Sequence, residues 1–285
     1  MQQTNYYKAE LSRLITLALA EDVGEGDVTS QLLIPADKKA SLVFRNREPL
    51  VVAAIDLIEQ VYAQLDENIS VEYFVEEGAH LSASSKMAVV KGNAQALLTG
   101  ERVALNILQR ACGVATLTNR FVQEISDTEA VILDTRKTMP SMRYLDKYAV
   151  RCGGGQNHRM RLDDRILIKD NHIAICGGIA NALKSAKSGN KDNLLIEIEC
   201  DTIAQLEEVL AEGADWVLLD NMDNAMLAKA VAMASNHSIE LEASGGVNLD
   251  TVKAIAETGV NAISVGALTH SAIAVDIGLD FSYLD

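Results

Sequence analysis

A basic segment in the middle of the chain carries the strongest chemical signal in the sequence. Between Asp134 and His172 it holds nine Lys or Arg residues against five Asp, a net charge of +4 in a chain whose formal charge is −15. Guanidinium groups suit carboxylate or phosphate, and ammonium groups act as movable point charges. A solvated basic face is the common alternative for a run of charges. The cationic residues are Arg136, Lys137, Arg143, Lys147, Arg151, Arg159, Arg161, Arg165 and Lys169.

The positions of these residues favour a ligand pocket over a solvated face. Residues 135–137 directly follow the apolar run VILD, and Lys169 directly follows a second run, ILI. Residues 153–155 are three glycines, which fit a loop whose backbone approaches a ligand closely or takes positive φ. Donors for a planar anion come immediately afterwards, at Asn157, His158 and Arg159. The segment therefore predicts a site for a small anion.

Two acidic residues, Glu199 and Asp220, each end a short apolar run. Such a pair can hold Mg²⁺ through water or accept hydrogen bonds from ribose hydroxyls. A salt bridge or helix cap is the commoner role for one strand-end acid, but a pair on neighbouring units favours a functional site. Glu197 alternates with Glu199 on the same strand, and we expect one of the two to face away from the lumen, the inside of the barrel that the strands are expected to form.

Glycine turns end two later runs, at Ser244, Gly245 and Gly246 and at residues 264–266, which include Gly266. Loops after the last strands of α/β barrels commonly bind phosphate through backbone N–H groups. Turn chemistry alone explains one glycine more easily than both clusters. The two turns therefore predict a phosphate site.

The elements that must position these residues are repeated strand–helix units. The short apolar runs are separated by helical patterns at 202–212, 224–235 and 250–258, which predicts a parallel sheet, closed as a barrel or open and doubly wound. An open sheet gathers functional residues at a switch point, whereas a barrel opens all its strand ends on one face. Polar residues end six successive runs, and this favours the barrel.

The first third of the chain predicts a smaller domain. Apolar spacing indicates a helix over 6–19, and segments between 40 and 92 alternate as in a small sheet with a helix near 55–65. A longer helix is expected over 97–125, bridging the two domains. The stretch 258–275 lacks charged residues, but glycines and polar residues interrupt it, and we interpret it as strand, turn and helix start rather than a membrane span.

Composition excludes several classes of function. A charge of −15 disfavours nucleic acid or an anionic membrane as partner. Four widely spaced cysteines without a Cys-x-x-Cys pair indicate neither a zinc site nor a redox dithiol. The N-terminal stretch MQQTNYYKAELSRL lacks a basic region followed by an apolar core, so we expect a cytoplasmic location.

Seven motifs in order make the chain resemble the quinolinate phosphoribosyltransferase family. They are DTRKT, the GGGxNHR run, LIKDNH, IEIE, LLDNM, EASGG and SVGALTHS, with GERVALNIL upstream. The resemblance runs from EDVGEGDVTS nearly to the end of the chain. Two departures concern loop geometry more than chemistry. Met139-Pro140-Ser141 stands where the family usually has a Thr-Pro-Gly pattern, and Arg161 replaces a usual glycine.

The resemblance implies an α/β fold, with a C-terminal α/β barrel and a smaller N-terminal α/β sandwich-like domain. The expected ranges are 1–112, 113–270 and a C-terminal segment 271–285 that packs back on the first domain. It also implies a homodimer, Mg²⁺ as cofactor, and the conversion of quinolinate and phosphoribosyl pyrophosphate to nicotinate mononucleotide, pyrophosphate and CO₂ in de novo NAD biosynthesis.

The resemblance also assigns roles to single residues. The two quinolinate carboxylates would be held by Arg136, His158, Arg159 and the partner subunit's Arg102. Lys137 and Lys169 would face phosphoribosyl pyrophosphate, while Glu199 and Asp220 would serve the ribose and Mg²⁺. The 5-phosphate would lie on the turns that contain Ser244, Gly245, Gly246 and Gly266.

Three other functions remain open on the residues alone. A nicotinate phosphoribosyltransferase shares the chemistry but needs fewer Arg and His donors. An aldolase could use Lys169 as a Schiff-base nucleophile. A non-catalytic barrel could bind phosphate without turnover.

Overall fold

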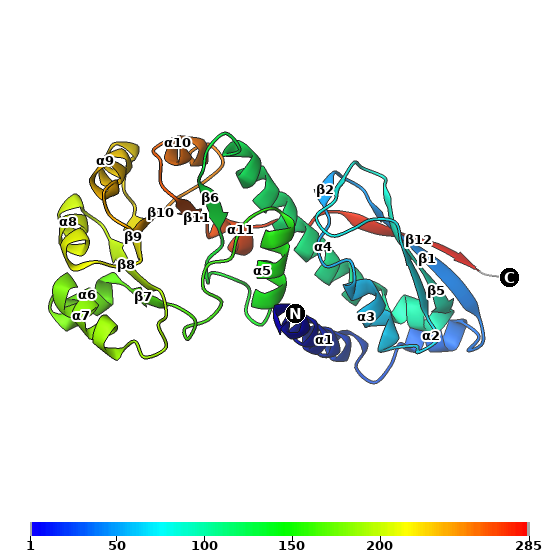
Figure 1. Ribbon diagram of the computed structural model, residues 1–285. Coiled ribbons are helices and arrows are strands. Elements are labelled where there is room, and N and C mark those ends of the chain that lie inside the picture. The colour runs from blue at the N-terminus through cyan, green and yellow to red at the C-terminus, as the bar shows by residue number, and fades with distance from the viewer. Residues whose placement is uncertain (1, 284–285) are drawn as a thin grey trace. The chain divides into compact units, whose positions relative to one another are not determined.

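The structure is a computed structural model that describes residues 2–283 (Figure 1). The chain forms two compact units. The first comprises Met1–Asn119, Thr138–Gly154 and Ser271–Asp285, and the second comprises Arg120–Lys137 and Gly155–His270. The first unit holds a four-stranded and a two-stranded sheet, and the second unit holds a six-stranded sheet. Among the described residues, no helix combines the length and the apolar character that a membrane crossing requires.

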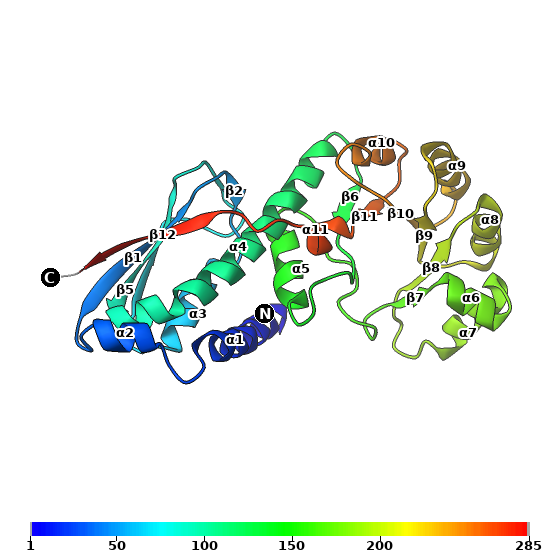
Figure 2. The same cartoon turned by 180° about the vertical axis from the view of Figure 1, so that it is seen from behind.

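The first unit is built on a four-stranded antiparallel sheet in the order β12-β1-β5-β3. Leu42 and Phe44 alternate along β1 and are buried, as the two-residue period of a strand with one core face requires. The last strand, β12, lies beside β1 in both views (Figure 2). The strands of this unit are β1 (Lys39–Asn46), β2 (Leu50–Val51), β3 (Ser70–Tyr73), β4 (His80–Leu81), β5 (Lys86–Asn93) and β12 (Ile277–Tyr283).

Helices cover this unit where the sequence pattern places them. The expected helix over 6–19 is confirmed within the longer α1, because Tyr7, Leu11, Ile15 and Leu19 recur every four residues and are buried. The expected helix near 55–65 is also confirmed, as α3. The helices are α1 (Gln2–Val23), α2 (Val28–Leu33), α3 (Leu57–Ala63), α4 (Ala94–Glu124) and α5 (Arg143–Cys152).

The long helix α4 confirms the expectation over 97–125. Asn93 precedes it, and its side-chain oxygen accepts a hydrogen bond from the Ala96 N–H at 3.1 Å, so one of the first orphan donors is satisfied. Val103, Ile107 and Ala111 form part of its buried face. Residues 120–124 of this helix belong to the second unit.

The second unit is a six-stranded parallel sheet in the order β6-β11-β10-β9-β8-β7. Because every pairing is parallel, all six C-terminal strand ends lie along the same edge. The expected α/β class with parallel strands is confirmed. The strands are β6 (Val131–Leu133), β7 (Ile166–Ile168), β8 (Ile196–Cys200), β9 (Trp216–Asp220), β10 (Glu240–Ser244) and β11 (Ala262–Ser264).

The edge strands of this sheet are β6 and β7. An isolated bridge between Leu133 and Gln156 adds a pairing beside β6, and the pairings among the described residues do not join β6 to β7. Complete closure into a barrel is therefore not part of the observed hydrogen bonding. The strand ends still gather the polar residues on one edge, which is the feature that matters for the site.

Helices of the second unit begin directly after the strand-end loops. Thr202 caps α8 through the Gln205 N–H, and Asp223 caps α9 through the Met226 N–H. The helix expected at 250–258 appears as a shorter one, and the stretch 258–275 contains a strand and a helix start, as expected. The helices are α6 (Asp170–Cys176), α7 (Ile179–Gly189), α8 (Ile203–Glu212), α9 (Asn224–Ala234), α10 (Val252–Ala256) and α11 (Ala267–His270).

Candidate active site

A cavity of about 270 Å³ lies at the C-terminal strand ends of the second unit. All six strands of the parallel sheet, or the loops that follow them, contribute to its wall. The walls mix cationic, acidic and small polar side chains, as a site for a charged and hydroxylated ligand requires. The lining residues are Thr135, Arg136, Lys137, His158, Arg159, Leu167, Lys169, Glu199, Leu218, Asp220, Glu242, Ser244 and Ser264.

Most of the residues singled out in the sequence meet in this wall. They are Arg136, Lys137, His158, Arg159, Lys169, Glu199, Asp220 and Ser244. Gly245, Gly246 and Gly266 belong to the turns beside the wall. Arg102 is not among the lining residues. It lies on α4 in the first unit, its side chain is 61% exposed, and it stands 3.9 Å from Glu101.

Gly245 is required by its surroundings, and Gly266 lies in a tight space. Gly245 has φ +98°, and a Cβ there would clash with the side chain and backbone of Asn221. A Cβ on Gly266 would lie 3.1 Å from the Lys137 Cδ, so the absence of a side chain leaves room for that lysine. The turn at Gly266 therefore brings backbone close to Lys137, on the cationic side of the cavity.

The backbone of Lys137 is fixed on two sides. Its N–H donates to the Thr135 hydroxyl at 3.0 Å, and its carbonyl accepts from the Thr269 hydroxyl at 2.9 Å. The loop after β6 is therefore joined to α11. Asp134, which is fully buried, accepts from the His158 N–H at 2.9 Å and from the Asn157 amide at 2.6 Å, so the same loop also holds residues 157–158.

Two carboxylates of the cavity wall, those of Glu199 and Asp220, stand together with the exposed carboxylate of Asp201. Oxygens of Glu199, Asp201 and Asp220 lie within 4.8 Å of one another, and Lys169 Nζ is 3.6 Å from the Glu199 Oε2. Burial raises the pKa of Glu199, and Lys169 opposes this rise. Burial also raises the pKa of Asp220, and the negative charge of Asp201 adds to it. Crowded oxygen ligands of this kind suit a hard divalent cation.

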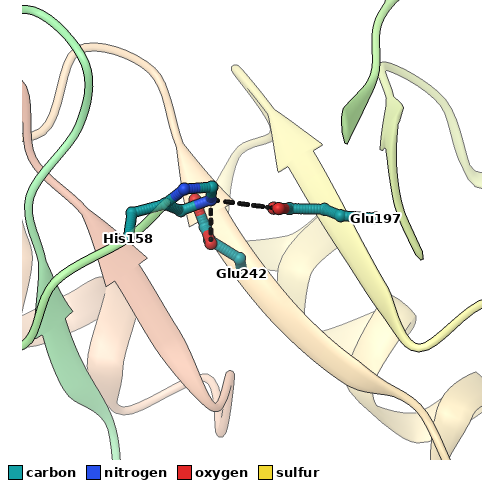
Figure 3. A group of neighbouring side chains, drawn as sticks. All are labelled: His158, Glu197 and Glu242. Carbon is teal, nitrogen blue, oxygen red and sulfur yellow. Dashed lines mark hydrogen bonds and ion pairs between the residues drawn. The ribbon is translucent and has the colours of Figure 1, made fainter. Parts of the chain in front are cut away.

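Below these groups, His158, Glu197 and Glu242 form a buried cluster (Figure 3). The His158 Nε2 lies 3.0 Å from a Glu197 oxygen and 3.4 Å from a Glu242 oxygen. The His158 Nδ1 lies 2.7 Å from the backbone nitrogen of Arg159. Both ring nitrogens therefore have partners within the protein, although the ring itself forms part of the cavity wall.

The pKa values of the side chains in this cluster shift in different directions. Burial alone would raise the pKa of Glu197, but His158 and Arg165 outweigh it and hold that pKa below its usual value. Burial raises the pKa of Glu242, which His158 only partly opposes. Burial would lower the pKa of His158, yet the two carboxylates outweigh it and raise that pKa to about 9. Burial, followed by the charge of Arg136, lowers the pKa of Arg159.

The expectation that one of Glu197 and Glu199 faces away from the interior is wrong. Residues two apart on a strand share a face. Glu197 is fully buried and contacts His158, while Glu199 lies in the cavity wall and contacts Lys169. The same period explains why Leu218 and Asp220, and likewise Glu242 and Ser244, line the cavity in pairs.

The sequence interpretation missed three acidic residues of the site: Asp201, Glu197 and Glu242. Asp201 lies two residues after Glu199, in phase with the inner face of β8. Glu197 and Glu242 each lie inside a strand, two residues before a residue already assigned to the site and therefore in phase with it. The sequence did hold a signal for Glu197 and Glu242: an acidic residue in the middle of a buried strand needs a partner, and this indicates a polar site.

One departure from the family pattern has a structural counterpart in the first unit. Ser141 has φ +62°, in the left-handed region that glycine occupies without strain. The loop thus keeps a conformation suited to glycine while carrying serine. Arg161 ends in an exposed ion pair, with its Nε 3.1 Å from an Asp163 oxygen.

Comparisons with known proteins cover nearly the whole chain. Residues 114–280 match the family model "Quinolinate phosphoribosyl transferase, C-terminal domain", and residues 27–112 match the N-terminal domain model of the same family. The chain is similar to quinolinate phosphoribosyltransferase (decarboxylating) 2a, mitochondrial, of Nicotiana tabacum, with 42% identity over 95% of this chain and 82% of the relative.

A bacterial relative and a solved structure agree with this. The chain is 42% identical to the probable nicotinate-nucleotide pyrophosphorylase (carboxylating) of Bacillus subtilis, over 95% of this chain and 93% of the relative. It is also similar to the solved structure of the nicotinate-nucleotide pyrophosphorylase from Francisella tularensis. That likeness has a TM-score of 0.90 and 39% identity, and it covers 96% of both chains.

Proposed function

The chain belongs to the quinolinate phosphoribosyltransferase family, and from this we propose that it joins quinolinate to phosphoribosyl pyrophosphate in NAD biosynthesis. The products are nicotinate mononucleotide, pyrophosphate and CO₂. The observation that carries this proposal is a cavity lined both by four cationic side chains and by strand-end acids. Those cations are Arg136, Lys137, Arg159 and Lys169.

Quinolinate is assigned to the side of the cavity formed by Arg136 and Arg159, with His158 in the adjoining wall. Planar guanidinium groups match the two carboxylates of the acid. We assign a further contact to Arg102 of a partner subunit in a homodimer, since Arg102 is exposed on α4 and lines no part of this chain's own cavity. A site shared across a two-fold dimer would use each Arg102 once.

Phosphoribosyl pyrophosphate is assigned to the opposite side. Lys137 and Lys169 are placed to meet its pyrophosphate, and the turns after β10 and β11 to receive its 5-phosphate through backbone N–H groups. The residues of these turns in the proposal are Ser244, Gly245, Gly246 and Gly266. Glu199 and Asp220 would accept hydrogen bonds from the ribose hydroxyls or bind the metal.

Magnesium fits the acidic side of the cavity. Glu199, Asp201 and Asp220 offer oxygen donors within 4.8 Å of one another, and Mg²⁺ prefers one or two carboxylates together with water and substrate phosphate. When bound, the ion would neutralise charge on the leaving pyrophosphate.

The chemistry depends on positioning, because the pyridine nitrogen is a weak nucleophile. Arg136 and Arg159 would orient that nitrogen towards the anomeric carbon, where the new N–C bond forms as the C–O bond to pyrophosphate breaks. Lys137 and Lys169 would stabilise the departing charge. Glu199 and Asp220 would favour the positive character that develops on the ribose. The C2 carboxylate then leaves as CO₂, its bonding electrons stay on the cationic ring, and C2 takes up a proton.

An assay of two acceptors tests this function directly. Pyrophosphate and nicotinate mononucleotide are measured with quinolinate and, separately, with nicotinate. We expect strong preference for quinolinate, because a nicotinate ring leaves guanidinium groups without their second carboxylate. Equal turnover of both acids would reassign the chain to nicotinate chemistry. A cytoplasmic location also belongs to the proposal.

A further inference from the structure

Four residues of the second unit form a closed circuit of hydrogen bonds beneath the cavity. Glu197 Oε2 lies 3.0 Å from the His158 Nε2 and 3.3 Å from the Arg165 Nη1. The backbone carbonyl of Arg165 accepts from the Arg159 Nη1 at 3.4 Å. The Arg159 N–H points at the His158 Nδ1 at 2.7 Å. From Glu197, one path of contacts runs through His158 and a second path, or arm, runs through Arg165, and both reach Arg159.

Within the circuit, Arg159 lines the cavity, whereas Glu197 does not. Glu197 is fully buried on β8, and its two neighbours His158 and Arg165 reach Arg159 by different routes. His158 reaches the backbone of Arg159, and Arg165 reaches its guanidinium. Because Arg159 is held both at its backbone N–H and at its guanidinium group, that group can point in fewer directions.

The hydrogen bonds also define the proton positions on His158. A doubly protonated ring would direct Nδ1–H at the Arg159 N–H, donor against donor. The ring protonated on Nε2 alone donates to Glu197 and accepts from Arg159, so it keeps every contact of the circuit. The carboxylates favour the charged ring, whereas the direct 2.7 Å contact with the Arg159 N–H keeps Nδ1 unprotonated in this arrangement. His158 thus connects Glu197 to Arg159, and its ring also forms part of the cavity wall.

We propose that Glu197 is a positioning residue for substrate recognition, which acts through His158 and Arg165 to hold Arg159 against a carboxylate of the pyridine acid. The proposal rests on the proposed function, because it takes the anion at Arg159 to be quinolinate. Glu242, 3.4 Å from the His158 Nε2, supports the same connector from β10. The two carboxylates thus hold the ring from β8 and from β10, the strands on either side of β9 (Figure 3).

Glu197→Gln tests the proposal, because it keeps the shape of the side chain and removes the charge. We expect the KM for quinolinate to rise about ten-fold, as is common when a residue that orients a ligand-binding group is changed. The KM for phosphoribosyl pyrophosphate should stay within about two-fold of wild type. Glu240→Gln is the matched control, since Glu240 lies on β10 with an exposed side chain outside the cavity. It should change neither constant.

The measurements separate this inference from the proposed function. Wild-type protein that forms no nicotinate mononucleotide from quinolinate would overturn the function itself. Active wild type with a Glu197→Gln variant whose two KM values are unchanged, or rise equally, would overturn only the positioning role. If Glu197→Gln does not fold, Arg165→Met breaks the link between Glu197 and residue 165 while leaving the backbone carbonyl of residue 165 and the pairing of His158 in place. Its quinolinate KM must then rise selectively, and an unchanged value contradicts the proposal.

Discussion

The ammonium nitrogen of Lys169 lies 3.6 Å from Oε2 of Glu199, where β7 and β8 end side by side. The lysine side chain is half exposed and the glutamate is mostly buried. The pair leaves Glu199 partly neutralised while Asp201 and Asp220 crowd the same space. A divalent cation would relieve this repulsion between carboxylates.

Activity should require Mg²⁺, and Asp201 should contribute to its affinity. Excess chelator is expected to abolish formation of nicotinate mononucleotide, and Asp220→Ala to be nearly inactive. Asp201→Asn should raise the Mg²⁺ concentration for half-maximal rate by about ten-fold. Asp192→Asn removes an exposed acid outside the cavity and serves as control. Full activity in chelator contradicts the metal assignment.

Arg136 and Lys137 are adjacent in the chain but should differ in kinetics. Arg136→Ala is expected to raise the KM for quinolinate by at least about ten-fold, because a guanidinium–carboxylate contact is lost. Lys137→Ala should mainly lower kcat, because the leaving pyrophosphate loses a positive charge. Steady-state kinetics with each substrate varied in turn distinguishes the two effects. Should both variants change only the affinity for phosphoribosyl pyrophosphate, this division of roles is wrong.

Replacing Ser141 by glycine should stabilise the protein. Serine at φ +62° carries steric strain that glycine does not, and the net gain after the greater backbone freedom of glycine is about 0.5–1 kcal/mol. Urea denaturation of Ser141→Gly measures it as a higher midpoint. Ser238→Gly is the control, because Ser238 is exposed and does not have positive φ. A midpoint that falls in both variants would show that the strain at Ser141 is negligible.

The buried Glu197 should make the free energy of unfolding fall as the pH is lowered into the acidic range. Its pKa is held low because His158 and Arg165 outweigh the effect of burial. A carboxyl with a lowered folded-state pKa stabilises the fold above its unfolded value of about 4.3, and this contribution is lost as pH falls through the folded value. Urea midpoints between about pH 6 and pH 3 should therefore fall more steeply for wild type than for Glu197→Gln. Parallel curves would contradict this.

The site residues at the strand ends were predictable from the sequence, because charged residues directly follow apolar runs there. Lys169, Glu199 and Asp220 each follow an apolar run, and in a parallel sheet those ends share one edge. The family resemblance added the substrate, which residue spacing alone left open. Helices α1 and α4 were predictable because apolar residues recur along one face of each, and that face is buried.

Other features depend on neighbours that are distant in the sequence. The circuit around Glu197 joins residues from 158 to 197, and nothing local to any one strand indicates that His158 would find two carboxylates. Gly245 is required because Asn221, at the end of the neighbouring strand, occupies the space of its missing side chain. The inward face of Glu197, in contrast, was predictable, because residues two apart on a strand share a face.

Arg102 tests whether the active site is shared between subunits. Its side chain is 61% exposed on α4, and its ion pair with Glu101 at 3.9 Å is a surface contact of little energetic value. If each Arg102 completes the site of its partner in a two-fold dimer, Arg102→Ala and Asp220→Ala should each be nearly inactive alone. Both variants should keep the wild-type unfolding midpoint, which excludes loss of the fold as the cause.

Mixing the two variants should then restore activity. In a mixed dimer, the subunit that carries Arg102→Ala keeps its own Asp220 and receives an intact Arg102 from its partner, so one of the two sites is whole. Random co-refolding makes half of the dimers mixed, and total activity should reach roughly a quarter of wild type. Native mass spectrometry measures the fraction of mixed dimers in the same sample. Absence of recovery when mixed dimers are present would place Arg102 in its own subunit's site or outside the active site, since only a residue supplied by the partner can be complemented in this way.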